Sequence, residues 1–200
     1  MGIFRIPQFD MRYPPEQKIR TRDPIVRNAA RKLRVEGLSG PSVASIMKAS
    51  GLTVGGFYKY FRSKDELVAE AIAQAFSDSE KIYSSLQNLP REDRWKEIVR
   101  WYLSPEHCDH ADTGCPVAEL APEIARTKLG LRKRIADLMK DRSARWMEFM
   151  PGATAGKREQ NFWVIFSAMA GAISIVRIFT DRADRERVLT TMRDHLLHSF

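Results

Sequence analysis

Two cysteines and two histidines lie close together near the middle of this 200-residue chain. His107, Cys108 and His110 fall in the polar segment SPEHCDHADTG, and Cys115 stands directly before Pro116. Proline suits the first position of a helix, so Cys115 is expected at a helix N-terminus, where the helix dipole favours a thiolate. Cys115 could therefore be a reactive thiol, with Cys108 in a flexible loop as its resolving partner.

Two other interpretations of this cluster remain open. His107, Cys108, His110 and Cys115 could bind zinc, although their irregular spacing is not that of common zinc sites. Alternatively, the two cysteines are structural residues without a chemical role. The sequence thus predicts a possible redox role for Cys108 and Cys115, and it predicts neither a metal site nor a cofactor.

Enzyme chemistry finds little support elsewhere in the chain. There is no phosphate-binding loop, no Rossmann glycine pattern and no convincing pair of nucleophile and base among the residues, which include only four histidines. The sequence therefore argues against an enzyme, and an enzyme on a helical scaffold is kept as the weakest alternative.

The stretch from Ser42 to Glu66, SVASIMKASGLTVGGFYKYFRSKDE, is the most informative part of the sequence. It predicts a short helix over 43–50, a turn at Gly51 and a second short helix over 54–60. The S-x-x-E pattern that begins at Ser63 is a capping box, which predicts another helix start. Two short helices joined by a glycine turn are the signature of a helix-turn-helix.

Hydrophobic spacing predicts an all-α fold with about nine helices and no strands. The expected helices cover about 22–36, 43–50, 54–60, 64–86, 93–103, 117–126, 129–150, 157–180 and 183–200. Residues 1–21, which contain three prolines, are expected to form an irregular N-terminal arm. A helix-turn-helix domain then spans 22–66, and a body that senses an effector and dimerises spans 67–200.

The last two predicted helices carry the dimerisation hypothesis. The helix over 157–180 contains FWVIFSAMAGAISIVRIF and is apolar nearly all round, so it must be buried on several sides. Its small residues around Gly171 would let another helix approach closely. A C-terminal helix pair of this kind predicts a four-helix dimer interface, and the alternative is a core within one chain.

The charge of the chain is concentrated in its first third. The formal net charge is +8, and residues 12–64 hold twelve Lys or Arg against three Asp or Glu, whereas 65–200 hold twenty against twenty-one. A basic domain on a neutral body is the electrostatic footprint of nucleic-acid binding. Two cysteines, no signal peptide and no long apolar run predict a cytoplasmic protein without a membrane partner.

Residues 22–67 resemble the TetR family of bacterial transcriptional regulators. The resemblance rests on IVRNAARKL with its following EG turn, on SVASIMKASGLT and on GGFYKYFRSKDEL, and it covers about fifty residues. GCPVAELAPEIAR is also similar to one TetR subgroup. The resemblance implies an all-helical homodimer with a C-terminal ligand domain. It also implies a repressor that leaves a palindromic double-stranded DNA operator when an effector binds.

Carried over by position, the resemblance implies a set of DNA-binding residues. They are Ser42, Val43, Thr53, Val54, Gly55, Gly56, Tyr58, Lys59, Tyr60 and Lys64. The family often has lysine at the position of Val54 and histidine at that of Tyr60, so Lys59 is expected to carry more of the contact. Lys64 is expected to bind phosphate at a helix N-terminus.

The resemblance also implies a cavity for an unknown small-molecule effector, or for an electrophile or oxidant. Its expected lining residues are Trp101, Trp146, Phe162, Phe166 and Met169, although aromatic and methionine residues at helical spacing are more typical of a core. The expected mechanism is a shift between two dimer states, of which only one holds the two reading helices about 34 Å apart. A DNA-compacting protein without sequence specificity is the main alternative.

Overall fold

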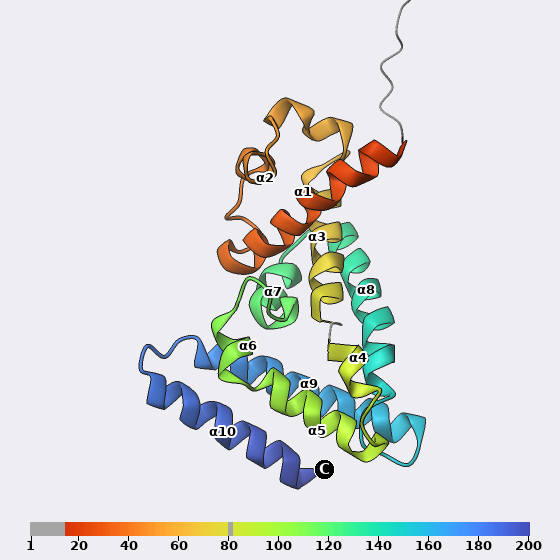
Figure 1. The fold of residues 1–200 in the computed structure, drawn as a ribbon, viewed down its shortest axis with the longest axis vertical. Helices are drawn as coiled ribbons and strands as arrows, with labels where there is room; N and C mark the ends of the chain where they lie inside the picture. The colour runs from red at the N-terminus through yellow and green to blue at the C-terminus, as the bar shows by residue number, and fades with distance from the viewer. Residues whose placement is uncertain (1–14, 80–81) are drawn as a thin grey trace, which may run out of the picture.

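The computed structural model describes residues 15–79 and 82–200, and within them the chain forms ten α-helices, one 3₁₀-helix and no strand (Figure 1). This confirms the predicted all-α fold. The elements are α1 (Pro15–Glu36), α2 (Val43–Ala49), η1 (Val54–Lys59), α3 (Lys64–Ser79), α4 (Tyr83–Leu86), α5 (Arg91–Tyr102), α6 (Pro105–Asp109), α7 (Pro116–Ala125), α8 (Leu129–Met147), α9 (Ala155–Val176) and α10 (Arg182–Ser199). In Figure 1, α1, α2 and η1 form one end of the molecule, and α9 and α10 form the other.

Helix α1 begins earlier than the sequence suggested. It starts at Pro15, so the expected irregular arm is wrong for 15–21, and residues 1–14 lie outside the described part. Proline is well suited to a helix start, and the Glu, Gln, Lys and Arg residues that follow are good helix formers. Pro24 consequently lies inside the helix instead of in its first turn, and it forgoes one backbone hydrogen bond there.

The N-terminal end, called the reader below, comprises α1, α2, η1 and the first part of α3. One apolar cluster holds it together, and its fully buried large side chains include Ile25, Leu33, Ile46, Met47, Phe57, Phe61, Leu67 and Ile72. The rings of Phe57 and Phe61 stack with their centroids 5.5 Å apart. Gly51 adopts φ +72° after α2, and the Leu52 N–H donates to the Met47 carbonyl at 2.9 Å.

The second helix of the motif is a 3₁₀-helix, whereas the sequence predicted an ordinary helix over 54–60. Gly55 and Gly56 fill one third of its six residues, and glycine is among the poorest helix formers. The next helix starts as predicted, because Ser63 Oγ accepts the Glu66 N–H at 3.1 Å. Glu66 in turn accepts the N–H of Arg62 at 2.6 Å, which completes a capping arrangement close to the expected one.

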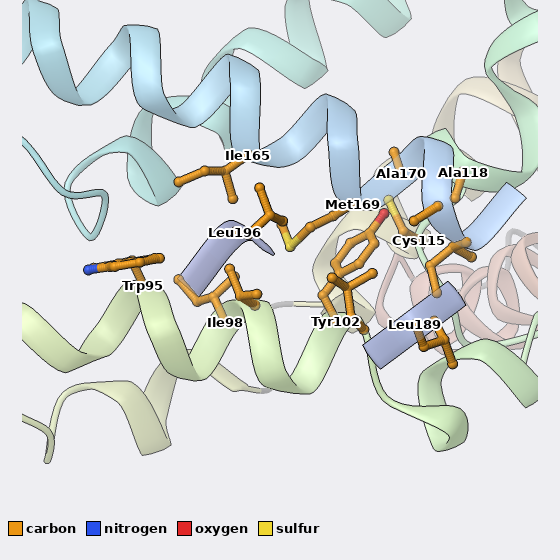
Figure 2. Close-up of a cluster of buried hydrophobic side chains, with 14 of the residues drawn as sticks. Trp95, Ile98, Tyr102, Cys115, Ala118, Ile165, Met169, Ala170, Leu189 and Leu196 are labelled. Carbon is orange, nitrogen blue, oxygen red and sulfur yellow. The ribbon is translucent and has the colours of Figure 1, made fainter. Parts of the chain in front are cut away.

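The remaining helices form the body, whose core lies mainly between α5, α9 and α10. Figure 2 shows this core, in which Ile98 and Tyr102 of α5 face Ile165 and Met169 of α9. The predicted helix over 64–86 is divided into α3 and α4, with residues 80–81 outside the described part. None of the helices within the described ranges has the length and apolar character needed to cross a bilayer.

Helix α7 belongs to both cores. Its Leu120 is buried in the reader cluster, whereas Ala118, and Cys115 just before the helix, are buried in the body cluster. The reader cluster also extends along α3 as far as Ala75. The expected domain boundary after residue 66 therefore does not coincide with the end of the reader core.

Candidate nucleic-acid interface and body cavity

The expected DNA-binding residues of η1 lie on an exposed edge of the reader. Thr53, Val54, Gly55 and Lys59 are all exposed, with Val54 at 55%. Tyr58 is 79% exposed, which is unusual for a large aromatic side chain. These residues are held in place from behind by Phe57, which is buried, so the edge is a rigid surface.

Two more of the expected residues lie at helix starts. Ser42 caps α2, because its Oγ accepts the Ser45 N–H at 3.0 Å. Lys64 opens α3, and its Nζ donates to the Pro41 carbonyl at 3.1 Å, so it connects the start of α3 to the residues before α2. Val43, in the first turn of α2, is half-buried and packs on the reader core.

The two glycines of η1 are not demanded by the protein's own packing. A methyl group at Gly55 would meet nothing within 4 Å, and one at Gly56 would come no closer than 3.8 Å to Met47. Neither glycine has a positive φ.

Tyr60 differs from the expectation of an outward-pointing contact residue. It is half-buried against the reader core, and its carbonyl accepts the Arg22 Nε–H at 3.3 Å. The Arg22 guanidinium lies 4.6 Å from the centroid of the Phe61 ring and pairs with Glu66 and Glu70. The sequence had placed Arg22 at the start of the first helix without naming a partner for it. Glu66 and Glu70 lie four residues apart on one helix face, and this spacing could have indicated that they share an arginine partner.

Asn28 is a further contact that sequence reasoning missed. Its side-chain amide donates to the Ala49 carbonyl at 3.1 Å and to Ser50 Oγ at 3.0 Å. These bonds satisfy groups at the C-terminal end of α2, where carbonyls lack helical partners. Asn28 therefore fixes α2 relative to α1, and with it the position of η1.

The five expected effector residues surround one cavity of about 60 Å³ in the body. Trp101 comes from α5, Trp146 from α8, and Phe162, Phe166 and Met169 from α9. The rest of the lining is mostly apolar, and Tyr102, Cys115, Arg142 and Ser143 supply polar groups. The five residues predicted from the sequence therefore line one cavity, while their role in ligand binding stays a prediction.

One end of this cavity is formed by Tyr102 and Cys115. The Tyr102 hydroxyl points toward the sulfur of Cys115 (Figure 2). Tyr102 is only 5% exposed, and its hydroxyl has no hydrogen-bond partner among the described residues. Burial raises the pKa of Tyr102 well above its usual 10.0, and the neighbouring Cys115 adds to the rise. The hydroxyl is therefore protonated at neutral pH and is available as a donor.

His107 packs behind Tyr102. Its Nδ1 lies 2.7 Å from the Tyr102 carbonyl, which can only accept, so the ring proton sits on Nδ1. Its Nε2 is buried and, within the described part of the chain, has no partner. Burial lowers the pKa of His107 from 6.5, and the Arg177 charge lowers it further, against the opposing effect of the bond to Tyr102. His107 is thus a neutral side chain of the core.

Cys108 lies on α6 and not in the flexible loop that the sequence suggested. It is 2% exposed, and its Sγ accepts an N–H of Arg185 at 3.3 Å. Its carbonyl accepts the Arg177 Nε–H at 2.9 Å, so the backbone is held as well. Both cysteines are free thiols. Within 15–79 and 82–200 no three His, Cys, Asp or Glu side chains come together as a metal site would require.

Cys115 occupies the N-cap of α7, as the Cys115–Pro116 pair predicted. It is 6% exposed and borders the cavity, whereas Cys108 borders a separate surface hollow with Arg182 and Arg185. The two thiols therefore face different spaces, and a role as attacking and resolving partners stays a prediction.

Residues 25–71 match the model of the bacterial regulatory proteins, tetR family. An uncharacterised HTH-type transcriptional regulator of Bacillus subtilis, YdgC, is 32% identical over 84 residues, which cover 40% of this chain and 43% of that protein. The match thus spans less than half of that relative. A second uncharacterised HTH-type regulator, from the lacX 3′ region of Lactococcus lactis, is 26% identical over 80% of this chain and 85% of its own length.

Solved structures with the same fold include a TetR-family regulator from Cytophaga hutchinsonii, with TM-score 0.72 and 21% identity over 91% of this chain and 96% of its own. E. coli NemR in its reduced form gives TM-score 0.68 and 16% identity over 88% and 96%. FadR from Bacillus subtilis in complex with stearoyl-CoA gives 0.64 and 15% over 89% and 98%. The family model thus assigns residues 25–71 to the bacterial regulatory proteins, tetR family, and the chain as a whole shares its fold with solved TetR-family regulators.

Proposed function

We propose that this protein is a homodimeric repressor that binds a palindromic DNA operator and leaves it when a small effector occupies the body cavity. The observation that carries the proposal is the position of α7. One end of this helix borders the cavity at Cys115, and the other contacts the reader. A change in the cavity therefore has a direct mechanical route to the DNA-binding end.

Hydrogen bonds at both ends of α7 support this route. Next to its N-terminus, the Gly114 carbonyl accepts an N–H of the buried Arg34 of α1 at 3.3 Å. Toward its C-terminus, Glu123 accepts the Leu38 N–H at 2.8 Å, just beyond the end of α1. An effector that displaces α7 would disturb α1 at two points, and the spacing of the two readers in the dimer would change with it.

The exposed edge of η1 supports DNA binding by a mixture of contacts. Lys59 and Lys64 would meet phosphates, and the methyl groups of Val54 could meet a thymine methyl in the major groove. Gly55 and Gly56 would let the backbone approach closely, since they leave open space on the outer side of η1. The excess of basic residues over 12–64 would strengthen the attraction.

An apolar stripe along α9 supports the homodimer. Val164 and Ile175 of α9 and Ile178 in the turn that follows it are at least half exposed, and Gly171 between them is open to solvent. An exposed stripe of this kind with a small residue at its centre is typical of a helix–helix interface. Figure 1 shows that α9 and α10 lie together at the end of the body farthest from α2.

The size of the cavity restricts the effector. At about 60 Å³ it is far smaller than the roughly 300–1,000 Å³ of pockets for drug-sized ligands. FadR of the same fold holds stearoyl-CoA, a much larger molecule. Either a small effector binds this protein, or Met139, Met150 and Met169 move to widen the cavity, as flexible methionine side chains can.

A DNA footprint at several salt concentrations tests the proposed DNA binding. The wild-type protein should protect a palindromic site, and Lys64→Ala should weaken binding and lower the salt slope by about one. Lys140→Ala, an exposed lysine of α8 remote from the reader, is the matched control and should keep the wild-type slope. Uniform coverage of DNA without a protected palindrome would instead support a compacting protein.

Sedimentation tests the proposed dimer. Ile175→Glu places a charge in the middle of the α9 stripe and should shift the protein to monomers at micromolar concentration. Val35→Glu, at an equally exposed apolar residue of α1, should leave the dimer intact. A dimer that survives the substitution in α9 would show that another surface mediates assembly.

A further inference from the structure

The cavity combines a thiol and an unused hydroxyl at one end with an apolar remainder. We propose that Cys115 and Tyr102 form a covalent site for short α,β-unsaturated carbonyl compounds, in which Cys115 attacks the alkene and Tyr102 donates a hydrogen bond to the carbonyl oxygen. The inference rests on the proposed function only in treating this cavity as the effector site.

Tyr102 defines the acceptor that a ligand must bring. Its hydroxyl is protonated and buried, and it faces the weakly accepting Cys115 thiol without a full hydrogen bond, so that an unsatisfied buried donor carries a free-energy cost. A group that only accepts, such as a carbonyl oxygen, would remove this cost. His107 does not supply this acceptor. Its Nδ1 faces the Tyr102 carbonyl, and its accepting Nε2 is buried without a partner among the described residues.

Cys115 defines the reacting atom. It occupies the N-cap position of the ten-residue helix α7, at the positive end of the helix dipole, although its sulfur accepts no backbone N–H there. The Arg177 guanidinium interacts electrostatically with Cys108 first, and then with Tyr102 and Cys115, so its charge does not distinguish the two thiols. The Tyr102 oxygen points toward the Cys115 sulfur (Figure 2).

The rest of the cavity restricts the electrophile to a short molecule. A space of about 60 Å³ holds roughly four to six water-sized groups, which is the size of a short enone. Its walls are aromatic rings and methionines such as Trp101, Phe162 and Met169. Arg142 and Ser143 are the other polar residues of the lining.

The reaction is an addition that needs no second reagent. The Cys115 sulfur forms a bond to the β-carbon of the electrophile, and the carbon–carbon π bond breaks. Its electrons move to the α-carbon and the carbonyl oxygen, where the Tyr102 hydroxyl stabilises the developing charge. The proton lost from the thiol ends on the α-carbon through solvent, so the product is a thioether with an intact carbonyl.

Cys108 serves as an internal control in the same molecule. Its sulfur is also buried, but it accepts an N–H from Arg185 and borders a different hollow without any unpartnered hydroxyl. The proposal therefore predicts that the preference for Cys115 over Cys108 is greater with an enone than with a simple alkylating reagent.

The test treats the full-length protein with methyl vinyl ketone and measures site-specific mass increases over time, with iodoacetamide as a reagent that needs no carbonyl activation. Cys115 should gain one ketone, Cys115→Ser should lose this product, and Cys108→Ser should keep it. Butanone, which lacks the alkene, should give no adduct. Tyr102→Phe should slow ketone addition at Cys115 about tenfold or more while leaving its reaction with iodoacetamide unchanged.

A second comparison needs no variant at position 102. In the wild-type protein, the ratio of ketone rate to iodoacetamide rate should be at least about tenfold higher at Cys115 than at Cys108. Equal ratios at the two cysteines, modification only at Cys108, or equal slowing of both reagents in Tyr102→Phe would each overturn the proposal.

Operator binding is measured separately by fluorescence anisotropy on the same samples. An adduct at Cys115 that leaves operator affinity unchanged would contradict effector release, the proposed function, while the chemistry of the site stands. Release of DNA by the ketone from Cys115→Ser would place the effector response elsewhere and would contradict the role of this covalent site in it.

Discussion

The reader and the body are packed on different principles. The reader core is closed: within residues 15–79, the one buried side-chain nitrogen or oxygen without a hydrogen-bond partner is Arg34 Nε. The body core contains a cavity, and it leaves the Tyr102 hydroxyl and His107 Nε2 unpartnered. A filled core holds the surface above it in one conformation, whereas a core with a cavity and unpartnered polar groups can change when a ligand binds.

The two cores meet where α1, α3 and α7 come together. Arg34 donates to the Gly114 carbonyl and pairs with Asp78 at 3.0 Å, although its own side chain has no exposed surface. Leu120 brings α7 into the reader core. Helix α7 therefore contacts both cores, and under the proposed function it would connect a change in the body core to the reader.

The largest expected effect comes from breaking this junction. Arg34→Met should lower the free energy of unfolding by about 3–5 kcal/mol, because it leaves the Gly114 carbonyl and Asp78 without their buried partner. Arg31→Met is the control, since Arg31 pairs with Asp112 at 3.2 Å but is 60% exposed, and it should cost at most about 1 kcal/mol. Urea unfolding measures both, and equal losses would show that the junction is an ordinary surface contact.

A pair of methionines compares the two cores directly. Met47 is fully buried in the reader, and Met169 borders the body cavity. Met47→Ala should cost about 2–5 kcal/mol, because a new void opens in a filled core. Met169→Ala should cost clearly less, because it enlarges a space that already exists and removes fewer contacts. If urea unfolding shows the same cost for both, the body core is as tightly packed as the reader core.

Much of the reader could be predicted from the sequence because its signals are local. Gly51 is the turn glycine, Ser63 is the cap, and Phe57 with Phe61 fixes which side of η1 is buried. Each of these follows from spacing or backbone preference over a few residues. The 3₁₀ geometry of η1 was not predicted, since two glycines weaken helix preference without saying which alternative forms.

The body site was predicted only in part, because its chemistry depends on distant residues. The five aromatic and methionine residues share the cavity, yet Tyr102 was left out, although it precedes the expected polar loop by only two residues. Its partner Cys115 comes from another helix. The expected loop contains α6, where contacts from Arg177 and Arg185 hold Cys108, and these partners are about 70 residues away in sequence.

Acid should weaken the body through His107. Its pKa is lowered from 6.5 by burial, so the unfolded chain binds this proton at a higher pH than the folded protein does. The stabilising contribution is complete above about pH 6.5 and is lost as the pH falls below it, by at most about 1.4 kcal/mol per pH unit. Urea unfolding from about pH 7.5 to about pH 5.5 should show this decline.

His107→Phe isolates the contribution of this residue. It keeps an aromatic ring against Trp101 and Tyr102, loses the bond to the Tyr102 carbonyl and should remove most of the decline with acid. His195→Phe, at an exposed histidine of α10, should retain the decline. An equal loss of stability with falling pH in His107→Phe would show that groups other than His107 cause the decline.

The smallest expected change in stability, and one of opposite sign, comes from the glycine at the exposed edge. Gly55→Ala should raise the free energy of unfolding by about 0.5–1 kcal/mol, because alanine restricts the unfolded chain and its methyl group would meet nothing within 4 Å. The same methyl should weaken operator binding if the backbone of η1 approaches DNA. Gly130→Ala in α8 is matched, because that position is equally open. It should give a similar gain in stability with unchanged DNA affinity. A loss of binding confined to Gly55→Ala would identify Gly55 as part of the DNA interface. Unchanged affinity in both variants would show that η1 merely tolerates the glycine.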